Sequence, residues 1–469
     1  MLTIQFLGAA REVTGSKHLI TTEKGKKILL DCGMFQGKGQ ETDAMNRNLG
    51  FNPRDIDCIV LSHAHIDHSG LIPYLYKKGF RGSVLSTPAT RDLCAMLFVD
   101  TAFIQQLDAK WYNKKMDRLH KPHVEPLYDH NHAEQCMRCF ITVDYDRRFR
   151  IDDNIELRFS NSGHMLGSAI CTLYIKDEGT VKTIAYTGDV GRAKSHILQS
   201  PQPFPQCDIL ITESTYGDRL HDEMLVSEEE LLQVVRHTCV EKQGKLIIPS
   251  FSVGRTQEIV FVLNNLYNEG KIPRIPVYVD SPLSVNATSI FRMYTPTLNE
   301  EVQDVMRFDP DPFGFNTLKY ISDIRESKAL NRDTRPGIII SASGMLEAGR
   351  VKHHVANHID DPSTTILFVG YCAPNTLGAK LQRPGIDIVS IFGFDHRMRA
   401  EIAKIEGFSG HGDYSELIQY YLSHQDPTKI RKVFVVHGEA GAQDVMKDHL
   451  YEAGFRSIDC PEKGETFVV

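Results

Sequence analysis

One turn constrains the fold of this chain more than any other feature of its sequence. Within six positions it carries four residues of metal-binding type, His63, His65, Asp67 and His68, directly after the apolar, strand-like run Asp57 to Leu61. The apolar residues that follow have helical spacing, so the turn joins a strand to a helix. His63 and His65 can point two imidazoles at one cation, while Asp67 and His68 at the helix start can face a second. The sequence therefore predicts a binuclear metal site; a polar turn with surface histidines is the alternative.

Other strand ends carry residues of the same type. His164, Asp189 and His437 each follow an apolar, strand-like run. An aspartate in such a place can bridge two cations with its two oxygens, since the metals of binuclear sites lie about 3.5–4 Å apart. Asp31 also follows a short apolar run; it is either a carboxylate that orients a ligand histidine or an ordinary aspartate turn. We expect these distant segments to meet at one metal centre.

Length and charge exclude several classes of protein. A chain of 469 residues predicts two to three domains, each able to bury its own core. The 53 basic and 60 acidic side chains give a net charge of −7, which excludes a polybasic protein that binds nucleic acid or membranes through bulk charge. No apolar run approaches the roughly 18 residues that a membrane span needs. Any nucleic-acid site must therefore be local, and we expect no contact with a membrane.

Cysteine usage and the first residues indicate the compartment. The ten cysteines are scattered, with only Cys136 and Cys139 close together, so neither a disulfide framework nor a zinc ribbon is predicted. These two, with His130 and His132, either hold a metal or are helix residues in a reducing cell; we expect the latter. The chain opens directly into a strand-like run without the features of a secretion signal. We therefore expect a cytoplasmic protein.

The rhythm of predicted elements changes twice along the chain. The first half is rich in short strands, at Thr3–Leu7, Lys27–Leu30, Asp57–Leu61, Ser83–Ser86, Ile155–Phe159, Ala169–Ile175 and Lys182–Thr187. From Asp208 buried strands alternate with helices, as in an α/β unit with a mostly parallel sheet. Within that block, Asn299 to Asn331 looks loop-rich. We predict a β-rich domain in two parts, 1–208 and 396–469, interrupted by an inserted α/β domain, 209–395.

Beyond the metal turn, the sequence resembles the β-CASP branch of the metallo-β-lactamase superfamily, which processes nucleic acids. The motifs that carry the resemblance are the segments 213–217, 249–258, 343–345 with 349–354, Gly370-Tyr371 with Gly378, 408–413 and 436–439. They are most similar to those of bacterial and archaeal relatives of the nuclease subunit of the eukaryotic cleavage and polyadenylation specificity factor. The resemblance implies an α/β fold: a four-layer αββα metallo-β-lactamase sandwich with an inserted α/β β-CASP domain.

The resemblance also implies a set of metal ligands and a substrate. Two zinc ions per chain would be bound, one by His63, His65, His164 and Asp189, the other by Asp67, His68, Asp189 and His437. Glu213, His411 and His437 match the family's motifs A, B and C. A histidine at motif C is typical of the branch that processes RNA, whereas the DNA-repair branch has an aliphatic residue there. The resemblance therefore favours RNA.

A catalytic set follows from this chemistry. Two cations can make hydroxide available near neutral pH and can neutralise a phosphodiester oxygen. The leaving ribose oxygen needs a proton, and His411 is the candidate general acid, with Glu213 behind it to hold its tautomer. We place Asp67, Glu213 and His411 in the catalytic set. The alternatives are a turn histidine that caps Asp413 and, for Glu213, a structural helix cap.

Two further regions could contact RNA. Small residues and one cation precede the helices of the inserted domain, at Ser250, Ser252 and Arg255 and again at Ser343, and the N–H groups at a helix start favour anions. We add Ser409, beside His411, to this substrate-binding set; ordinary small-residue turns are the alternative. The segment Lys110 to Lys115, with Arg118 and Lys121, mixes cations and aromatic residues as single-strand binding grooves do, but a solvated helix face accounts for it equally well.

Taken together, these features predict a zinc-dependent ribonuclease that hydrolyses single-stranded RNA as an endonuclease, with 5′-exonuclease activity left open. The ligands come from the outer segments and the serine turns from the insertion, so we expect RNA to thread between the two domains. The alternative is a hydrolase of small esters, thioesters or lactams, which would leave Glu213 and His411 without a role. A catalytically inactive scaffold protein is a third possibility, but such a protein would be expected to have lost metal ligands, and none is missing from this sequence. A homodimer is compatible with the sequence.

Overall fold

A computed structural model describes residues 1–37, 41–120, 122–177, 179–220, 224–370, 372, 375–405 and 407–469 of the chain. Tyr371 and Lys121, which the sequence motifs include, lie outside the described residues. The chain divides into two compact units. Unit 1 consists of Met1–Ala193, Ser200–Leu220 and His411–Val469, and unit 2 of Lys194–Gln199 and His221–Gly410.

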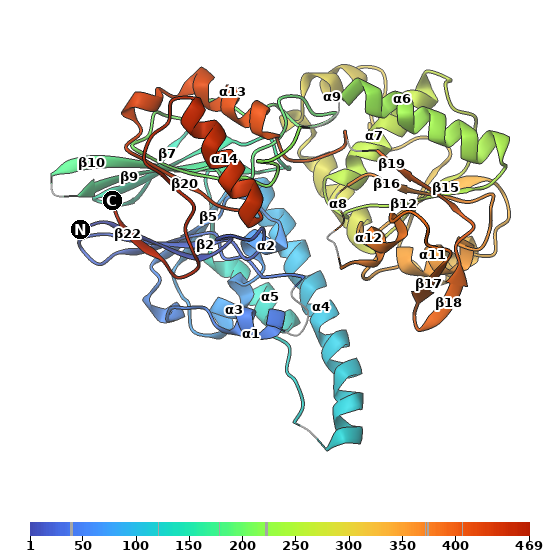
Figure 1. The fold of residues 1–469 in the computed structure, drawn as a ribbon, viewed down its shortest axis with the longest axis horizontal. Coiled ribbons are helices and arrows are strands. Elements are labelled where there is room, and N and C mark those ends of the chain that lie inside the picture. The colour runs from blue at the N-terminus through green and yellow to red at the C-terminus, as the bar shows by residue number, and fades with distance from the viewer. Residues whose placement is uncertain are drawn as a thin grey trace. The chain divides into compact units, whose positions relative to one another are not determined.

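Unit 1 is built on two sheets that pack face to face (Figure 1). The first has the strand order β22 (Thr466–Val468), β1 (Thr3–Gly8), β2 (Lys17–Thr21), β3 (Lys27–Leu30), β4 (Cys58–Val60), β5 (Ser83–Ser86), β6 (Phe140–Thr142). The second has the order β21 (Ile458–Asp459), β20 (Lys432–Val435), β11 (Ile209–Thr212), β10 (Thr180–Tyr186), β9 (Ala169–Asp177), β8 (Ile155–Asn161), β7 (Arg148–Asp152). Alternate apolar side chains of both sheets, among them Phe6 and Phe434 with ring centroids 4.8 Å apart, form the core between them.

Helices cover the outer faces of both sheets. Those of unit 1 are α1 (Glu41–Arg47), α2 (Ile66–Ser69), α3 (Ile72–Lys77), α4 (Pro88–Leu119), α5 (His130–Cys136), α13 (Tyr414–His424) and α14 (Ala440–Glu452). Leu417 and Tyr421 of α13 and Met446 of α14 pack on Leu210 and Val433 of the second sheet. Figure 1 shows α3 and α5 on the far side of the first sheet. The predicted four-layer αββα arrangement is therefore confirmed.

Unit 2 is an α/β unit around one parallel sheet. Its strand order is β14 (Leu318–Ile321), β13 (Val277–Asp280), β15 (Gly337–Ser341), β12 (Lys245–Pro249), β16 (Thr365–Phe368), β19 (Glu401–Lys404), and a hairpin joins β17 (Ile388–Ile391) to β18 (Phe394–Arg397). Its helices are α6 (Met224–Val235), continued by a π-helical turn at Arg236–Glu241, α7 (Arg255–Asn268), α8 (Pro282–Met293), α9 (Glu300–Val305), α10 (Ile324–Leu330), α11 (Val351–His358) and α12 (Leu377–Leu381). All the pairs of the six-stranded sheet are parallel, as the buried apolar runs predict.

Strand pairing places two segments differently from the sequence-based domain ranges. Strand β11 pairs with β10 and β20, so residues 209–212 belong to the sandwich of unit 1. Strand β19 pairs with β16, so residues 401–404 belong to the sheet of unit 2. The expectation of a loop-rich segment at 299–331 is wrong, because α9, β14 and α10 lie there. These elements are too short to give a clear periodic signal.

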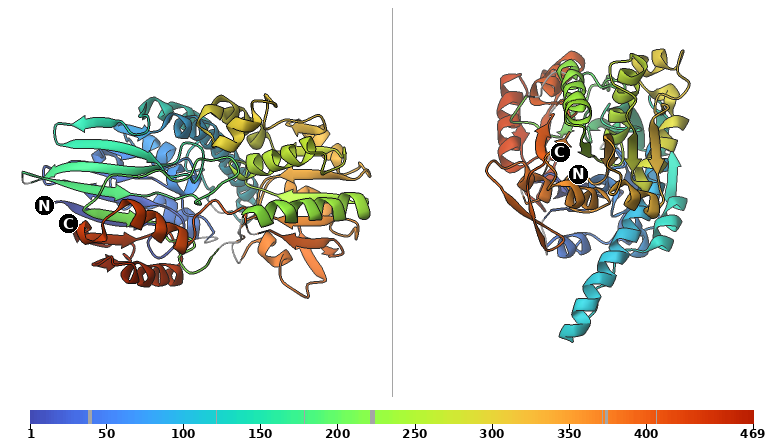
Figure 2. Two further views of the ribbon diagram at one scale, coloured as in Figure 1. Left: turned by 90° about the horizontal axis from the view of Figure 1, so that it is seen from above. Right: turned by 90° about the vertical axis from the view of Figure 1, so that its right-hand side faces the viewer.

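Several strands of unit 1 bring their carboxyl ends to one edge. Strands β3 and β4 are parallel, β10, β11 and β20 are parallel, and β8 runs in the direction of β10 because both are antiparallel to β9. The loops after these strands carry the candidate metal ligands. Figure 2 shows the same sheets from two further sides. Among the described helices, none combines the length and apolar character that crossing a bilayer requires.

Candidate metal centre

One group of candidate ligands gathers around the loop after β4. The donor atoms of His63, His65, His164 and Asp189 lie within 4.8 Å of one another. His65 Nδ1 is 3.1 Å from both His63 Nε2 and His164 Nε2, and Asp189 Oδ2 is 3.4 and 3.5 Å from the same two nitrogens. Zn–N distances of about 2.0–2.1 Å put neighbouring tetrahedral ligands roughly 3.3 Å apart. The spacing of these atoms thus suits one tetrahedral cation.

A second group lies beside the first. Asp67, His68 and His437 also bring donor atoms within 4.8 Å of one another. His68 Nε2 is 3.0 Å from His437 Nε2, and Asp67 Oδ2 is 3.6 Å from that same nitrogen of His437. Asp189 Oδ1 lies 3.3 Å from His68 Nε2 and 3.3 Å from His437 Nδ1. The two oxygens of Asp189 therefore face different ligand groups, as a bridging carboxylate does.

The chemistry of these donors fits a cation better than it fits a network of hydrogen bonds. Asp189 is 2% exposed, and its Oδ1 has no hydrogen-bond partner among the described residues. A buried, unsatisfied carboxylate oxygen is costly unless a cation neutralises it. The neighbouring ring nitrogens are atoms of the type that zinc binds. Metal binding thus accounts for a polar atom that the protein alone leaves unsatisfied.

Burial keeps the imidazoles of the first group neutral. Burial lowers the pKa of His63, His65 and His164, that of His65 to about 3, and the charge of neighbouring histidines adds to the effect. A neutral imidazole has the lone pair that a metal needs. These three side chains are therefore in the protonation state of metal ligands.

Asp31 lies behind His68. It is fully buried, and its Oδ2 accepts hydrogen bonds from His68 Nδ1 at 2.6 Å, from Ser62 Oγ at 2.7 Å and from the Tyr186 hydroxyl at 2.7 Å. Burial opposes its negative charge, but the hydrogen bond and charge of His68 lower the pKa of Asp31 below its usual value. With Nδ1–H held by Asp31, His68 presents Nε2 to the metal side.

Glu213 and His411 form a pair next to the ligand groups. Glu213 is buried after β11, and its Oε2 lies 3.0 Å from His411 Nδ1. Its Oε1 accepts from the backbone N–H of Val190 at 2.6 Å. Glu213 also forms, with Asp189 and His437, a third group whose donor atoms lie within 4.8 Å of one another. The His411 ring centroid is 4.5 Å from that of His164 and 6.2 Å from that of His437. Burial opposes protonation of His411, yet the Glu213 carboxylate raises its pKa to about 9.

Three residues that support the centre were not identified from the sequence. Ser62 and Tyr186 hold Asp31, and Thr215 Oγ1 lies 3.1 Å from His437 Nδ1. Ser62 and Tyr186 stand at or just beyond the end of a ligand-bearing strand. Position at a strand end was therefore a usable signal, but hydroxyl residues are common there and do not stand out.

The candidate substrate-binding residues lie in unit 2, at the carboxyl ends of neighbouring strands. Ser250 and Ser252 follow β12, and Ser343 follows β15. Ser250 is buried and accepts from Thr256 Oγ1 at 3.1 Å. Ser252 Oγ is 3.5 Å from Ser281 Oγ, and Ser343 Oγ donates to the Ala348 carbonyl at 3.3 Å. The structure thus brings these turns to one edge of the sheet.

Arg255 and Ser409 complete that set. Arg255 begins α7, forms an ion pair with Glu258 at 2.5 Å, and has its Nε buried without a hydrogen-bond partner in the described part of the chain. Its guanidinium lies 5.9 Å from the Phe408 ring centroid. Ser409 follows Phe408 within unit 2. An unsatisfied guanidinium nitrogen is compatible with an anionic ligand.

The remaining histidines and cysteines of interest do not form a metal group. His130 and His132 lie on α5 with the buried Cys136, as expected for helix residues, and Cys139 follows directly. Among the described residues, the groups compatible with a metal ion do not include them.

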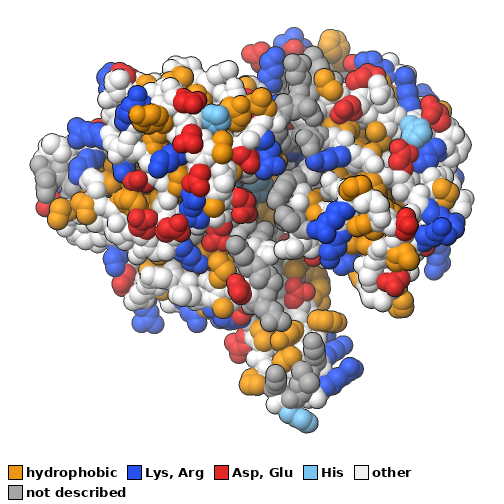
Figure 3. Space-filling view, in the orientation of Figure 1, with side chains coloured by type: hydrophobic (Ala, Val, Ile, Leu, Met, Phe, Trp, Pro, Cys, Tyr) orange, Lys and Arg blue, Asp and Glu red, His pale blue; other side chains and the backbone are white. Residues whose placement is uncertain are grey.

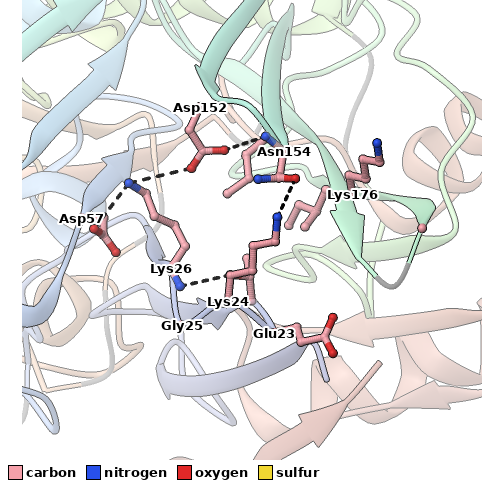
Figure 4. A pocket seen from close by; sticks show the side chains of 12 residues that line it. Glu23, Lys24, Gly25, Lys26, Asp57, Asp152, Asn154 and Lys176 are labelled. Atoms are coloured by element: carbon pink, nitrogen blue, oxygen red, sulfur yellow. Dashed lines mark hydrogen bonds and ion pairs between the residues drawn. The ribbon is translucent and has the colours of Figure 1, made fainter.

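A cavity of about 440 Å³ lies away from the metal centre (Figure 4). Its lining includes Lys24, Lys26 and Asp57, in the turns before β3 and β4, Asp152 at the end of β7, and Asn154 in the turn before β8. The candidate site residues follow β3, β4 and β8 at their other ends. Lys24 donates to Asn154, and Lys26 pairs with Asp57 and Asp152. The charges of these side chains therefore balance one another, and the metal-compatible groups among the described residues do not include them.

Comparisons with known families agree with this architecture. A model of the metallo-beta-lactamase superfamily matches residues 13–87, a Beta-Casp domain model matches residues 256–381, and a model described as a Zn-dependent metallo-hydrolase RNA specificity domain matches residues 395–461. A crystal structure of a protein of unknown function from Enterococcus faecalis covers 100% of both chains, with a TM-score of 0.54 and 13% identity. That likeness supports the fold alone.

Relatives of similar sequence are known from bacteria and archaea. The chain is 35% identical over 434 residues to Ribonuclease TTHA0252 of Thermus thermophilus, with 92% of each chain covered. It is 32% identical over 443 residues to an RNase J-like protein of Methanocaldococcus jannaschii, covering 94% of this chain and 93% of the relative. It is 34% identical over 446 residues to the Transcription termination factor FttA of the same organism, covering 93% of this chain and 67% of the relative.

Proposed function

Because this chain belongs to the β-CASP branch of the metallo-β-lactamase superfamily, we propose that it is a metal-dependent ribonuclease with two zinc ions per chain. The observation that carries the proposal is the position of Asp189, whose two oxygens face two separate groups of ligands. The ligands of one zinc are His63, His65, His164 and Asp189, and those of the other are Asp67, His68, Asp189 and His437.

Two divalent cations bound there would lower the pKa of a shared water and neutralise charge on a phosphodiester oxygen. The protein supplies the remaining chemistry. Asp67, whose Oδ2 lies 3.6 Å from His437 Nε2, would help hold the second cation and would accept a hydrogen bond from the attacking water. Asp31 fixes the ring of His68 through the 2.6 Å contact with Nδ1. Both residues thus hold groups in place before the substrate binds.

His411 is the general acid of the proposed reaction. Its Nδ1 faces Glu213 at 3.0 Å, so Nε2 is the nitrogen that gives a proton to the leaving ribose oxygen. Glu213 holds the ring in that tautomer and stabilises the imidazolium. The position of the ring beside His164 and His437 puts the proton donor next to the metal ligands.

RNA is the proposed substrate for two reasons. Relatives that share more than 90% of their length with this chain are named ribonucleases or RNase J-like, and the model that matches residues 395–461 is described as an RNA specificity domain. The alternative, a hydrolase of small esters, thioesters or lactams, is not favoured because it gives unit 2 and the Glu213–His411 pair no role. Ser250, Ser252, Arg255, Ser343 and Ser409 are the proposed phosphate-binding residues of unit 2.

Parallel assays on one preparation of the metal-loaded protein test this function. Labelled single-stranded RNA, matching single-stranded DNA, duplex RNA, a β-lactam and a thioester are offered under identical conditions. We expect cleavage of single-stranded RNA, slower cleavage of DNA and no turnover of the lactam or the thioester. Hydrolysis of either small substrate without cleavage of RNA would contradict the proposal.

A further inference from the structure

The second half of α4 exposes large apolar side chains to solvent. Phe103, Ile104, Leu107 and Trp111 are 57%, 43%, 50% and 72% exposed. Trp111 is the only tryptophan of the chain. Figures 1 and 2 both show this part of α4 extending away from the sheets of unit 1. A strip of this kind on the surface indicates a binding site.

The opposite face of the helix is covered by the chain that returns from its end. Asn113 and Val124 exchange two hydrogen bonds, at 3.0 and 2.8 Å, and the Leu127 N–H donates to Gln105 Oε1 at 3.0 Å. Met116 is buried on this covered face. The helix and the returning segment thus form an arm, residues 103–120 and 122–127, in which these hydrogen bonds support the exposed strip.

Cations share the exposed face with the apolar residues. Leu107, Trp111 and Arg118 and the two lysines between them, Lys110 and Lys114, are spaced by sums of three and four residues, which places all five on one side of the helix. None of these three cations forms an ion pair with a carboxylate of the described residues. Figure 3 shows Lys or Arg side chains next to hydrophobic ones on the projecting arm.

The mixture of aromatic, apolar and cationic side chains on this face distinguishes between two candidate ligands, a single-stranded nucleic acid and a second copy of the chain. Single-strand binding surfaces combine aromatic rings, on which bases stack, with cations that contact the phosphates. A second copy of the arm would bring the same three cations to this face, whereas a polyanion neutralises them. The exposed face of the arm therefore suits a single-stranded nucleic acid better than another copy of the chain.

The helix that carries the arm, α4, starts beside the loop of His164. Thr87 and Thr90, at the start of α4, donate hydrogen bonds of 2.7 and 2.8 Å to the Gly167 carbonyl, in the loop that carries His164. With a rise of about 1.5 Å per residue, Trp111 lies ~36 Å along the helix from Thr87. At ~3.4 Å per stacked nucleotide, about eleven nucleotides cover that length.

We propose that the exposed face of the arm, Phe103 to Arg118, is a second binding site for single-stranded RNA, which holds the part of a long substrate that lies outside the metal centre. This inference rests on the proposed ribonuclease function and adds a site to it. Bases stack on Trp111 and Phe103, and phosphates contact Lys110, Lys114 and Arg118. Short RNA is cut without using the arm.

Fluorescence of Trp111 reports on the arm directly, because no other tryptophan contributes. The metal-loaded protein is mixed rapidly with oligouridylate of several dozen nucleotides or with a uridine tetranucleotide, and emission is followed before cleavage. We expect the long RNA to quench emission, since a base stacks on the indole, and the tetranucleotide to leave it unchanged.

Steady-state kinetics then measure the contribution of the arm. Trp111→Ala should raise KM for the long RNA by roughly 5- to 100-fold, the range for loss of one stacked base, without changing kcat or the kinetics of the tetranucleotide. Tyr451→Ala, which removes a 60% exposed aromatic residue from α14, is the matched control and should change neither.

Replacing the three cations by glutamine tests the phosphate contacts. The combined Lys110→Gln, Lys114→Gln and Arg118→Gln variant should lower the slope of log affinity against log salt by about 2, at ~0.7 per phosphate contact. The variant Lys110→Arg with Lys114→Arg keeps the charge and should bind like the parent.

The outcomes separate this inference from the proposed function. Cleavage of long RNA without quenching, or with parental KM in both variants, would overturn the arm as a binding site and leave the ribonuclease standing. Quenching without cleavage would support the arm and contradict the ribonuclease. Emission that changes with protein concentration alone would identify a second copy as the ligand and overturn the inference.

Discussion

Each unit of the protein buries an aspartate beside histidine, at or just after the end of a strand, and the two sites are built in opposite ways. In unit 2, Asp280 ends β13 and is fully buried. It accepts hydrogen bonds from Ser327 Oγ at 2.5 Å, from Arg350 at 2.6 Å and from His354 Nε2 at 2.7 Å, and the other nitrogen of His354 lies 2.7 Å from Asn331 Oδ1. This network satisfies its own charges and hydrogen bonds.

In unit 1, Asp189 is buried to a similar degree, but the groups around its two oxygens are ring nitrogens of the candidate ligands. Its Oδ1 lies 3.3 Å from ring nitrogens of His68 and His437 and has no hydrogen-bond partner in the described part of the chain. A buried carboxylate whose oxygens are all held by hydrogen bonds needs no ion, whereas a cation accounts for a buried carboxylate oxygen that lies unsatisfied among other ligand atoms. The comparison teaches that the partners of a buried aspartate, rather than its burial, separate a structural site from a metal site.

The largest expected effect comes from removing the bridging carboxylate. Asp189→Ala should lose both metals and reduce RNA cleavage by more than about 10³-fold, because the metals contribute several kcal/mol to the transition state. Elemental analysis and a cleavage assay on the same preparation measure both. If Asp189→Ala kept full metal content and full activity, Asp189 would not be a metal ligand, and the proposed difference between Asp189 and Asp280 would be wrong.

Removing the proposed general acid should separate chemistry from metal binding. His411→Ala should keep both metals and bind RNA, yet cleave about 10²- to 10⁴-fold more slowly. Glu213→Gln is the matched control: it keeps a hydrogen-bonding partner for His411 but removes the charge, so a smaller loss is expected. Loss of metal from His411→Ala would show that the histidine is a ligand instead.

The hydrogen-bond network around Asp280 should contribute to the stability of the protein but not to its metal content. Asp280→Ala leaves Arg350 and His354 without their carboxylate, and breaking a buried pair costs about 3–5 kcal/mol of unfolding free energy. Denaturant unfolding measures this loss, and elemental analysis should give the parental metal content. A change in metal content with unchanged stability would reverse the roles of the two units.

The pH dependence of that loss has a defined sign. Burial opposes the charge of Asp280, but hydrogen bonds from His354, Ser327 and Arg350 lower its pKa below the usual value. A lowered folded-state pKa stabilises the protein above the unfolded-state pKa of about 3.9, and the contribution is lost as the pH falls through the folded-state pKa. The stability difference between the parent and Asp280→Ala should therefore shrink below about pH 4.

The smallest effect is expected for Asp31, which contacts the candidate ligand His68 and is not itself a proposed ligand. Asp31→Asn keeps the shape of the side chain but weakens the hold on His68, so zinc affinity should fall by about 10- to 100-fold, the usual range for residues that orient a ligand. Competition with a zinc chelator measures this. An unchanged affinity would leave the 2.6 Å contact between Asp31 and His68 without a role in metal binding.

The sequence predicts the candidate ligands more readily than the network around Asp280. His63, His164 and Asp189 each follow an apolar run, and a cluster as dense as HxHxDH is typical of a metal site. Asp280 and His354 are 74 positions apart, and each looks like an ordinary strand-end or helix residue. Only the folded sheet of unit 2, with β13 beside β15, brings them together.

Predictions of elements succeeded where periodicity is strong. The strands Lys27–Leu30 and Ser83–Ser86 have the predicted ends. The strand β11 lies in unit 1 rather than in the insertion, because hydrogen bonding to a distant strand, β20, decides its sheet. The 32-residue length of α4 was not predicted, since its apolar residues do not form a single core-facing stripe.

Anomalous diffraction at the zinc edge from crystals of the protein, purified without chelators, tests the central claim most directly. We predict two peaks about 3.5–4 Å apart, one beside each oxygen of Asp189, and none beside Asp280. A single peak bound only by His63, His65 and His164, or no peak near Asp189, would contradict the assignment of a bridging carboxylate and a binuclear centre.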